Sequence, residues 1–144
     1  MSTLVRIRSW LLALLVLQLA GSFIELVLLN HYEDVLQFIP LALIAPTLLL
    51  LVWHLVRPRP VTVRAIQVLM AGFVVAGLVG IVLHVQGAAA FQREMDPAQS
   101  SWSILQKAVR AQAPPALAPG VMLQMGLLGL VYAYRHPAAS PFME

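Results

Sequence analysis

The sequence of 144 residues contains no cysteine and few charged side chains. The lack of cysteine excludes disulfides, thiolate catalysis, zinc ribbons, iron–sulfur clusters and lipid attachment at a lipobox. Only 10% of the residues are Asp, Glu, Lys or Arg, against about a quarter in an average soluble domain. A soluble globule of this size exposes too much surface to water to cover it with so few charges.

Hydrophobic residues make up 60% of the chain, which is too many for a disordered protein. The class that remains is an integral membrane protein, so the lipid bilayer is expected to surround the chain as an interaction partner. The net charge of +3 comes from nine Lys and Arg residues against six acids, spread over chain ends and loops. Because no DNA- or RNA-binding motif accompanies this small excess, no nucleic-acid partner is expected.

Four runs of the sequence are long enough to cross a bilayer, which takes roughly 20 mostly apolar residues in a helix. They cover about 10–29, 35–56, 61–85 and 118–134. The first run has the basic flank of a signal peptide and a small-residue cleavage motif at Ala20–Ser22, but it continues to Leu29, beyond a typical signal core. We therefore predict an uncleaved all-α membrane protein, a four-transmembrane-helix bundle forming a single domain over residues 1–144.

An amphipathic helix is expected between the third and fourth spans, over about 97–112. Asp96 and Pro97 supply an N-cap and a proline at the first helical position. Trp102 lies on the apolar face, which predicts that the helix rests on the membrane surface with this side chain among the headgroups. The alternative is an extramembrane helix packed on the bundle.

The distribution of Lys and Arg predicts the orientation of the spans. The short link after the first span contains no Lys or Arg. Six arginines lie on the other side of the predicted membrane: Arg6, Arg8, Arg57, Arg59, Arg64 and Arg135. Both termini are therefore expected in the cytoplasm, with the chain in the plasma (inner) membrane.

Small residues recur on the third span at Gly72, Ala76 and Gly80, with His84 one turn further. Small side chains let helices approach closely in lipid, so this stripe is expected to face the bundle. The fourth span offers Gly126 and Gly129 for the same purpose.

Ionisable groups at membrane depth are costly and mark candidate sites. In the first span Gln18, Ser22 and Glu25 share a helix face. The predicted topology brings several polar side chains to one membrane level near the outer boundary: Glu25, His31, Glu33, Asp34, Gln37 and His84.

Three interpretations of this outer cluster are open. The first is a structural cluster in which Glu25 is hydrogen-bonded to a neighbour and Glu33 and Asp34 cap the second span. The second is a divalent-metal site built from carboxylates and imidazoles. The third is a site for protons or a polar ligand, in which a buried Glu25 exchanges protons with His84. Haem is disfavoured as a cofactor, because all four histidines lie close to the ends of spans.

No nucleophile elbow, phosphate loop, zincin helix or lipid-modification motif is present. The sequence therefore favours a non-enzymatic accessory, assembly or interaction subunit over an enzyme, with a membrane-protein partner or a homo-oligomer. The alternative function is a metal- or proton-binding membrane protein, a transporter or redox component, that uses Glu25, His31, Glu33, Asp34 and His84, supported by Gln37.

Overall fold

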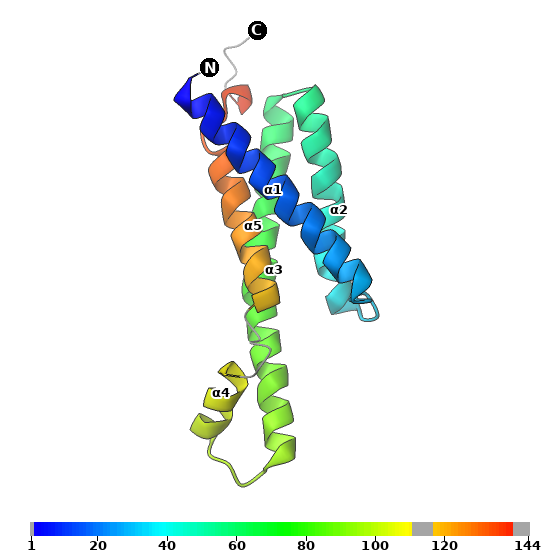
Figure 1. Ribbon diagram of the computed structural model, residues 1–144, viewed down its shortest axis with the longest axis vertical. Helices are drawn as coiled ribbons and strands as arrows, with labels where there is room; N and C mark the ends of the chain where they lie inside the picture. The colour runs from blue at the N-terminus through cyan, green and yellow to red at the C-terminus, as the bar shows by residue number, and fades with distance from the viewer. Residues whose placement is uncertain (1, 111–116, 140–144) are drawn as a thin grey trace.

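The computed structural model describes residues 2–110 and 117–139, and every secondary-structure element in these ranges is helical (Figure 1). The elements in chain order are α1 (Thr3–Leu28), α2 (Val35–Val56), α3 (Pro60–Met95), α4 (Ser101–Val109), α5 (Leu117–Ala133) and the short 3-10 helix η1 (Pro137–Ala139).

Three helices of the described ranges, α1, α2 and α3, are long and apolar enough to cross a membrane. This supports the prediction of an all-α membrane protein in its coarser part, the presence of long apolar helices. The helix α5 is equally apolar but has 17 residues. Pro40 and Pro46 lie inside α2 without ending it.

The helices run alternately up and down around α3 (Figure 1). The start of α1, the link between α2 and α3 and the end of α5 lie together, at what we call the terminal end. The hairpin between α1 and α2 lies toward the other, distal end. α5 lies along α3, whereas α1 crosses the other helices obliquely and diverges from α3 and α5 toward the distal end.

α3 is much longer than the third predicted span, which ended near residue 85. Its 36 residues span roughly 54 Å at ~1.5 Å per residue, nearly twice the ~30 Å of a bilayer core. The distal part of α3 therefore extends past the α1–α2 hairpin, and α4 lies beside this extension (Figure 1).

α4 is also shorter than the predicted helix over 97–112, of which 111–112 lie outside the described residues. Its N-cap is Ser100, whose hydroxyl accepts from the Ser103 N–H, so the prediction of Asp96 as N-cap is wrong. The reason is that α3 continues to Met95, which makes Asp96 the residue that ends α3. Ile104 and Ala108 are buried, while Trp102 is 67% exposed.

A core of aliphatic, Met and Phe side chains joins α1, α2, α3 and α5. Its fully buried members include Leu15, Leu19, Ile44, Leu51, Ile66, Met70, Phe73 and Met125. Large apolar side chains also cover the outside of the helices; Leu49 and Val68, for example, are 73% and 72% exposed. Such a surface suits lipid rather than water.

Glycines set the distance between α3 and α5. A Cβ on Gly77 would lie 2.7 Å from the Leu123 backbone nitrogen, and a Cβ on Gly126 would lie 2.7 Å from the Met70 carbonyl oxygen. Each helix thus presses a glycine against the other's backbone, which is how small residues hold membrane helices together. Gly80 also faces α5, at Pro119, whereas His84 of the predicted stripe is exposed.

Candidate functional site

The outer cluster expected from the sequence lies at the distal end, on three different elements. Glu25 is exposed near the end of α1, and His84 is exposed on α3. The remaining members lie in the α1–α2 link and the first turn of α2: His31, Glu33, Asp34 and Gln37.

No three Asp, Glu or His side chains of the described ranges lie close enough together to hold a metal ion. The structure therefore lends no support to a metal centre made by Glu25, His31, Glu33, Asp34 and His84.

Two residues of the outer cluster have local structural contacts. Asp34 is the N-cap of α2, and its Oδ1 accepts from the Leu36 N–H at 3.0 Å. This contact satisfies one of the free N–H groups at the start of a helix. His84 Nδ1 lies 2.9 Å from the Gly80 carbonyl oxygen, and because a carbonyl only accepts, the imidazole donates. The cap at Asp34 is the contact that the structural interpretation expected of this residue.

The polar face of α1, made of Gln18, Ser22 and Glu25, has a different environment; we call it the polar flank. Leu15 and Leu19 of the same helix are fully buried in the core, and at 100° per residue the polar flank lies beside them, at the border of the packed face. The buried Oε1 of Gln18 has no hydrogen-bond partner in the described part of the chain, and Glu25 is exposed.

The opposite border of α1 faces α2. There Val16 and Ala20 line a shallow hollow together with Leu55. The polar flank therefore lies on the border of α1 opposite this hollow.

The structure assembles a second polar cluster at the terminal end, which we call the histidine cluster: His54, Thr62, Tyr132 and His136. It comes from the end of α2, the start of α3 and the end of α5. His54 is 2% exposed and Tyr132 is 4% exposed. The His136 ring lies edge-on to His54 and beside Tyr132, with ring centroids 4.9 and 5.3 Å apart.

A short hydrogen bond ties α2 to α3 inside this cluster. His54 Nδ1 lies 2.6 Å from Thr62 Oγ1, and the same hydroxyl donates to the Arg59 carbonyl and accepts from the Arg59 N–H. The Thr62 hydroxyl thus bonds both to the buried imidazole of His54 and to the Arg59 backbone. Thr62 thereby ties α2 to α3 and at the same time closes the first turn of α3.

His136 connects the chain after α5 to the cluster. Its Nδ1 accepts from the Ala138 N–H at 3.2 Å, so its proton lies on Nε2. Burial, then the neighbouring His54 and then Arg8 lower the pKa of His136 from about 6.5 to about 4. Arg8 of α1 in turn donates to the carbonyls of Tyr134 and Arg135, a favourable position for a cation at the C-terminal end of a helix.

The sequence did not identify the histidine cluster as a site. His54 and His136 stand next to arginines at the ends of spans and resemble an ordinary positive flank. The available signal was the spacing of Tyr132 and His136, one helical turn apart, but nothing local indicates that His54 packs against them. Since the two imidazoles touch edge to face, no porphyrin fits between them.

Comparison with known proteins finds no matching family model, no similar curated protein and no similar solved structure. The function of the chain therefore has to be inferred from its own residues.

Proposed function

We propose that this chain is a non-enzymatic subunit of the plasma (inner) membrane that assembles with another membrane helix, from a partner protein or a second copy, through the polar flank of α1. The proposal rests on the hydrogen bonding and the exposure of the side chains in that flank. Gln18 and Glu25 lie within a helix long and apolar enough to cross the membrane. The buried Gln18 Oε1 nevertheless has no partner among the described residues, and Glu25 is exposed.

Polar side chains inside a membrane face protein or water, because lipid tails offer them no hydrogen bonds. In this chain the core face of α1 is filled by leucines, so its own bundle does not take up Glu25. A neighbouring helix with a donor at the depth of Glu25 would satisfy this exposed carboxylate. Hydrogen bonds between membrane helices contribute about 1 kcal/mol each, enough to select a partner and a register.

The topology that goes with this proposal has four spans, with both termini in the cytoplasm. The 17 residues of α5 reach roughly 26 Å at ~1.5 Å per residue, close to the ~30 Å of a bilayer core. The arginines of the terminal end favour the cytoplasmic side. α4, with its exposed Trp102, would lie at the outer membrane surface beside the extension of α3.

Site-specific crosslinking in native membranes tests the proposal. A photoreactive residue at position 22, in the middle of the polar flank, is expected to give a discrete protein adduct, either a partner or a dimer. The matched control is position 17, which is exposed on another face of the same helix and is expected to label lipid only.

A substitution adds the energetic test. Glu25→Leu is expected to weaken the adduct about fivefold or more, whereas Glu33→Gln, an exposed acid outside the helices, leaves it unchanged. Lipid labelling alone at position 22, or an adduct that Glu25→Leu does not affect, would overturn the proposal.

The alternative function, binding of a divalent metal or of protons at the outer cluster, makes a separate prediction. Mass spectrometric metal analysis of the purified protein would find a stoichiometric divalent ion that is lost in both Glu25→Gln and His84→Ala. That result would replace the proposed interaction function.

A further inference from the structure

Charge is strongly segregated along the described part of the molecule. Five exposed arginines surround the terminal end: Arg6 on α1, Arg57 and Arg59 in the α2–α3 link, Arg64 in the second turn of α3, and Arg135 after α5. The acids that the structure describes all lie toward the distal end: Glu25, Glu33, Asp34, Glu94 and Asp96. Within the described ranges these arginines have no acid near them, which leaves their guanidinium donors open to an external anion.

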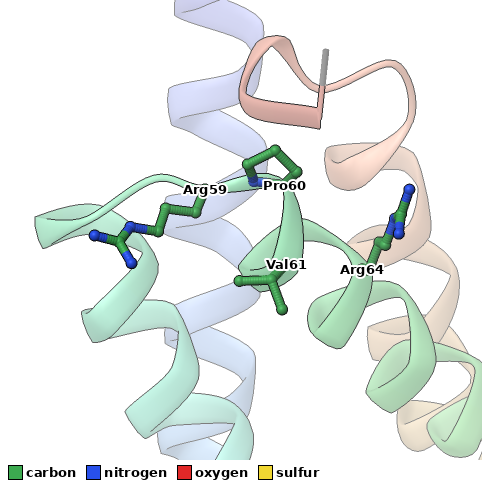
Figure 2. Close-up of a pocket in the computed structure, with 4 residues that line it drawn as sticks. All are labelled: Arg59, Pro60, Val61 and Arg64. Carbon is green, nitrogen blue, oxygen red and sulfur yellow. The ribbon is translucent and has the colours of Figure 1, made fainter. Parts of the chain in front are cut away.

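The start of α3 forms a shallow hollow between two of these arginines. It is lined by Arg59, Pro60, Val61 and Arg64. Figure 2 shows that the two guanidinium groups extend to opposite sides, with the Pro60 ring and the Val61 side chain between them. A cationic group thus stands on either side of an apolar centre, an arrangement that suits a surface of several anions better than one small anion.

An exposed apolar stripe leads away from this hollow along α3. Val61, Val68, Val75 and Val82 follow one another at intervals of seven residues, and they are 65%, 72%, 60% and 53% exposed. Residues seven apart lie nearly one above the other on a helix, and Arg64 lies one turn from both Val61 and Val68. Cationic donors therefore stand at the head of a continuous hydrocarbon-facing stripe.

We infer that this corner of the molecule, with Arg59 and Arg64 at its head and the valine stripe below, is a binding surface for anionic phospholipids. The guanidinium groups would bind headgroup phosphates of neighbouring lipids, and an acyl chain would lie along the valines. Arginine suits phosphate because its planar donors form paired hydrogen bonds. The valine stripe is the reason to assign a lipid rather than a soluble phosphate, since a soluble ion has no use for an apolar stripe. Basic surfaces at the cytoplasmic ends of membrane helices bind anionic headgroups in the same way.

Native mass spectrometry of the protein released from nanodiscs tests the inference. In discs of phosphatidylcholine with a minor fraction of phosphatidylglycerol, the wild-type chain is expected to retain phosphatidylglycerol in preference to phosphatidylcholine. Arg59→Gln/Arg64→Gln is expected to lower this preference by roughly ten- to thirty-fold, the effect of two arginine contacts of ordinary strength. The matched control is Arg93→Gln/Arg110→Gln, which removes the same charge from exposed positions toward the distal end.

Two further measurements distinguish a loss of charge from a loss of folding, and a lipid ligand from a free anion. Arg59→Lys/Arg64→Lys keeps the charge and is expected to retain most of the preference, which a loss of folding would not allow. Millimolar inorganic phosphate is expected to leave the bound phosphatidylglycerol in place. An equal loss in the control variant, an unchanged preference in the Gln variant, or displacement by phosphate would each overturn the inference.

Discussion

The contact between α3 and α5 allows a quantitative test, because each helix packs one glycine against the backbone of the other. A methyl group added at Gly77 would meet the Leu123 nitrogen at 2.7 Å and the Pro119 carbonyl oxygen at 2.9 Å. A methyl group at Gly126 would meet the Met70 carbonyl oxygen at 2.7 Å and the Val74 nitrogen at 2.9 Å. The atoms in the way belong to backbone and cannot rotate aside, so Gly77→Ala or Gly126→Ala must push the two helices apart.

The expected cost follows from the two effects of the added methyl group. Overpacking a well-packed interface costs about 1–3 kcal/mol, while Ala is better than Gly in a helix by roughly 1 kcal/mol. The net loss is about 0–2 kcal/mol for each substitution. Both substitutions push the same two helices apart, so their effects are coupled and the double variant should lose less than the sum of the two single losses.

Reversible unfolding in mixed detergent micelles measures these losses. The matched controls are Gly21→Ala and Gly87→Ala, since a Cβ at either position would have no atom within 4 Å; both should leave the free energy of unfolding unchanged or raise it by up to ~1 kcal/mol. If Gly77→Ala and Gly126→Ala were as stable as these controls, α3 and α5 would not be in backbone contact and the packing argument would be refuted.

Two more predictions concern the histidine cluster. The pKa of His136 is about 4 in the folded chain and about 6.5 when unfolded. Between these pH values the unfolded state therefore binds more protons than the folded state. The free energy of unfolding should fall as the pH drops through this window, by about 1–2 kcal/mol after allowance for partial exposure. His136→Asn keeps an acceptor for the Ala138 N–H without a titrating group, and its unfolding should show a flatter pH profile; an unchanged profile would contradict the assignment. Thr62→Val removes the hydroxyl that bonds to His54 Nδ1 and to the Arg59 backbone, and it should cost about 1–3 kcal/mol in the same unfolding assay. Thr62→Ser should restore most of the loss, and equal stability of the Val and Ser variants would contradict these hydrogen bonds.

The membrane class and the three long spans could be predicted because they depend on composition and on the length of apolar runs. The beginning and end of each helix were less predictable. α3 continues ten residues beyond the apolar run that ended at Val85, since Ala88–Ala90 and the residues after them are good helix formers and hydropathy does not decide where a helix ends. This extension turned Asp96 from an expected N-cap into a C-terminal residue of α3, and moved the start of α4 to Ser101.

Sites were harder to predict than spans, because a sequence gives the height of a residue in the membrane but not its direction around the bundle. Glu25 and His84 were placed at one level from their positions in the chain. The direction of each side chain depends on how α1 and α3 are rotated, which packing of the core determines. The histidine cluster is a further case, since His54 and His136 are far apart in sequence and meet only after four helices have packed.

The two ends of the molecule use their polar side chains in opposite ways, and this contrast bears on function. At the terminal end, Arg8, His54 and Thr62 find their hydrogen-bond partners within the chain, so these groups hold α1, α2, α3 and α5 together. Toward the distal end α1 diverges from α3 and α5 (Figure 1). Along this stretch lie Gln18, whose buried oxygen has no hydrogen-bond partner in the described ranges, and the exposed Glu25. Unsatisfied polar groups inside a membrane cost free energy unless something satisfies them. A helix that is fixed at one end and presents such groups where it diverges from its own bundle is therefore suited to receive a second helix there.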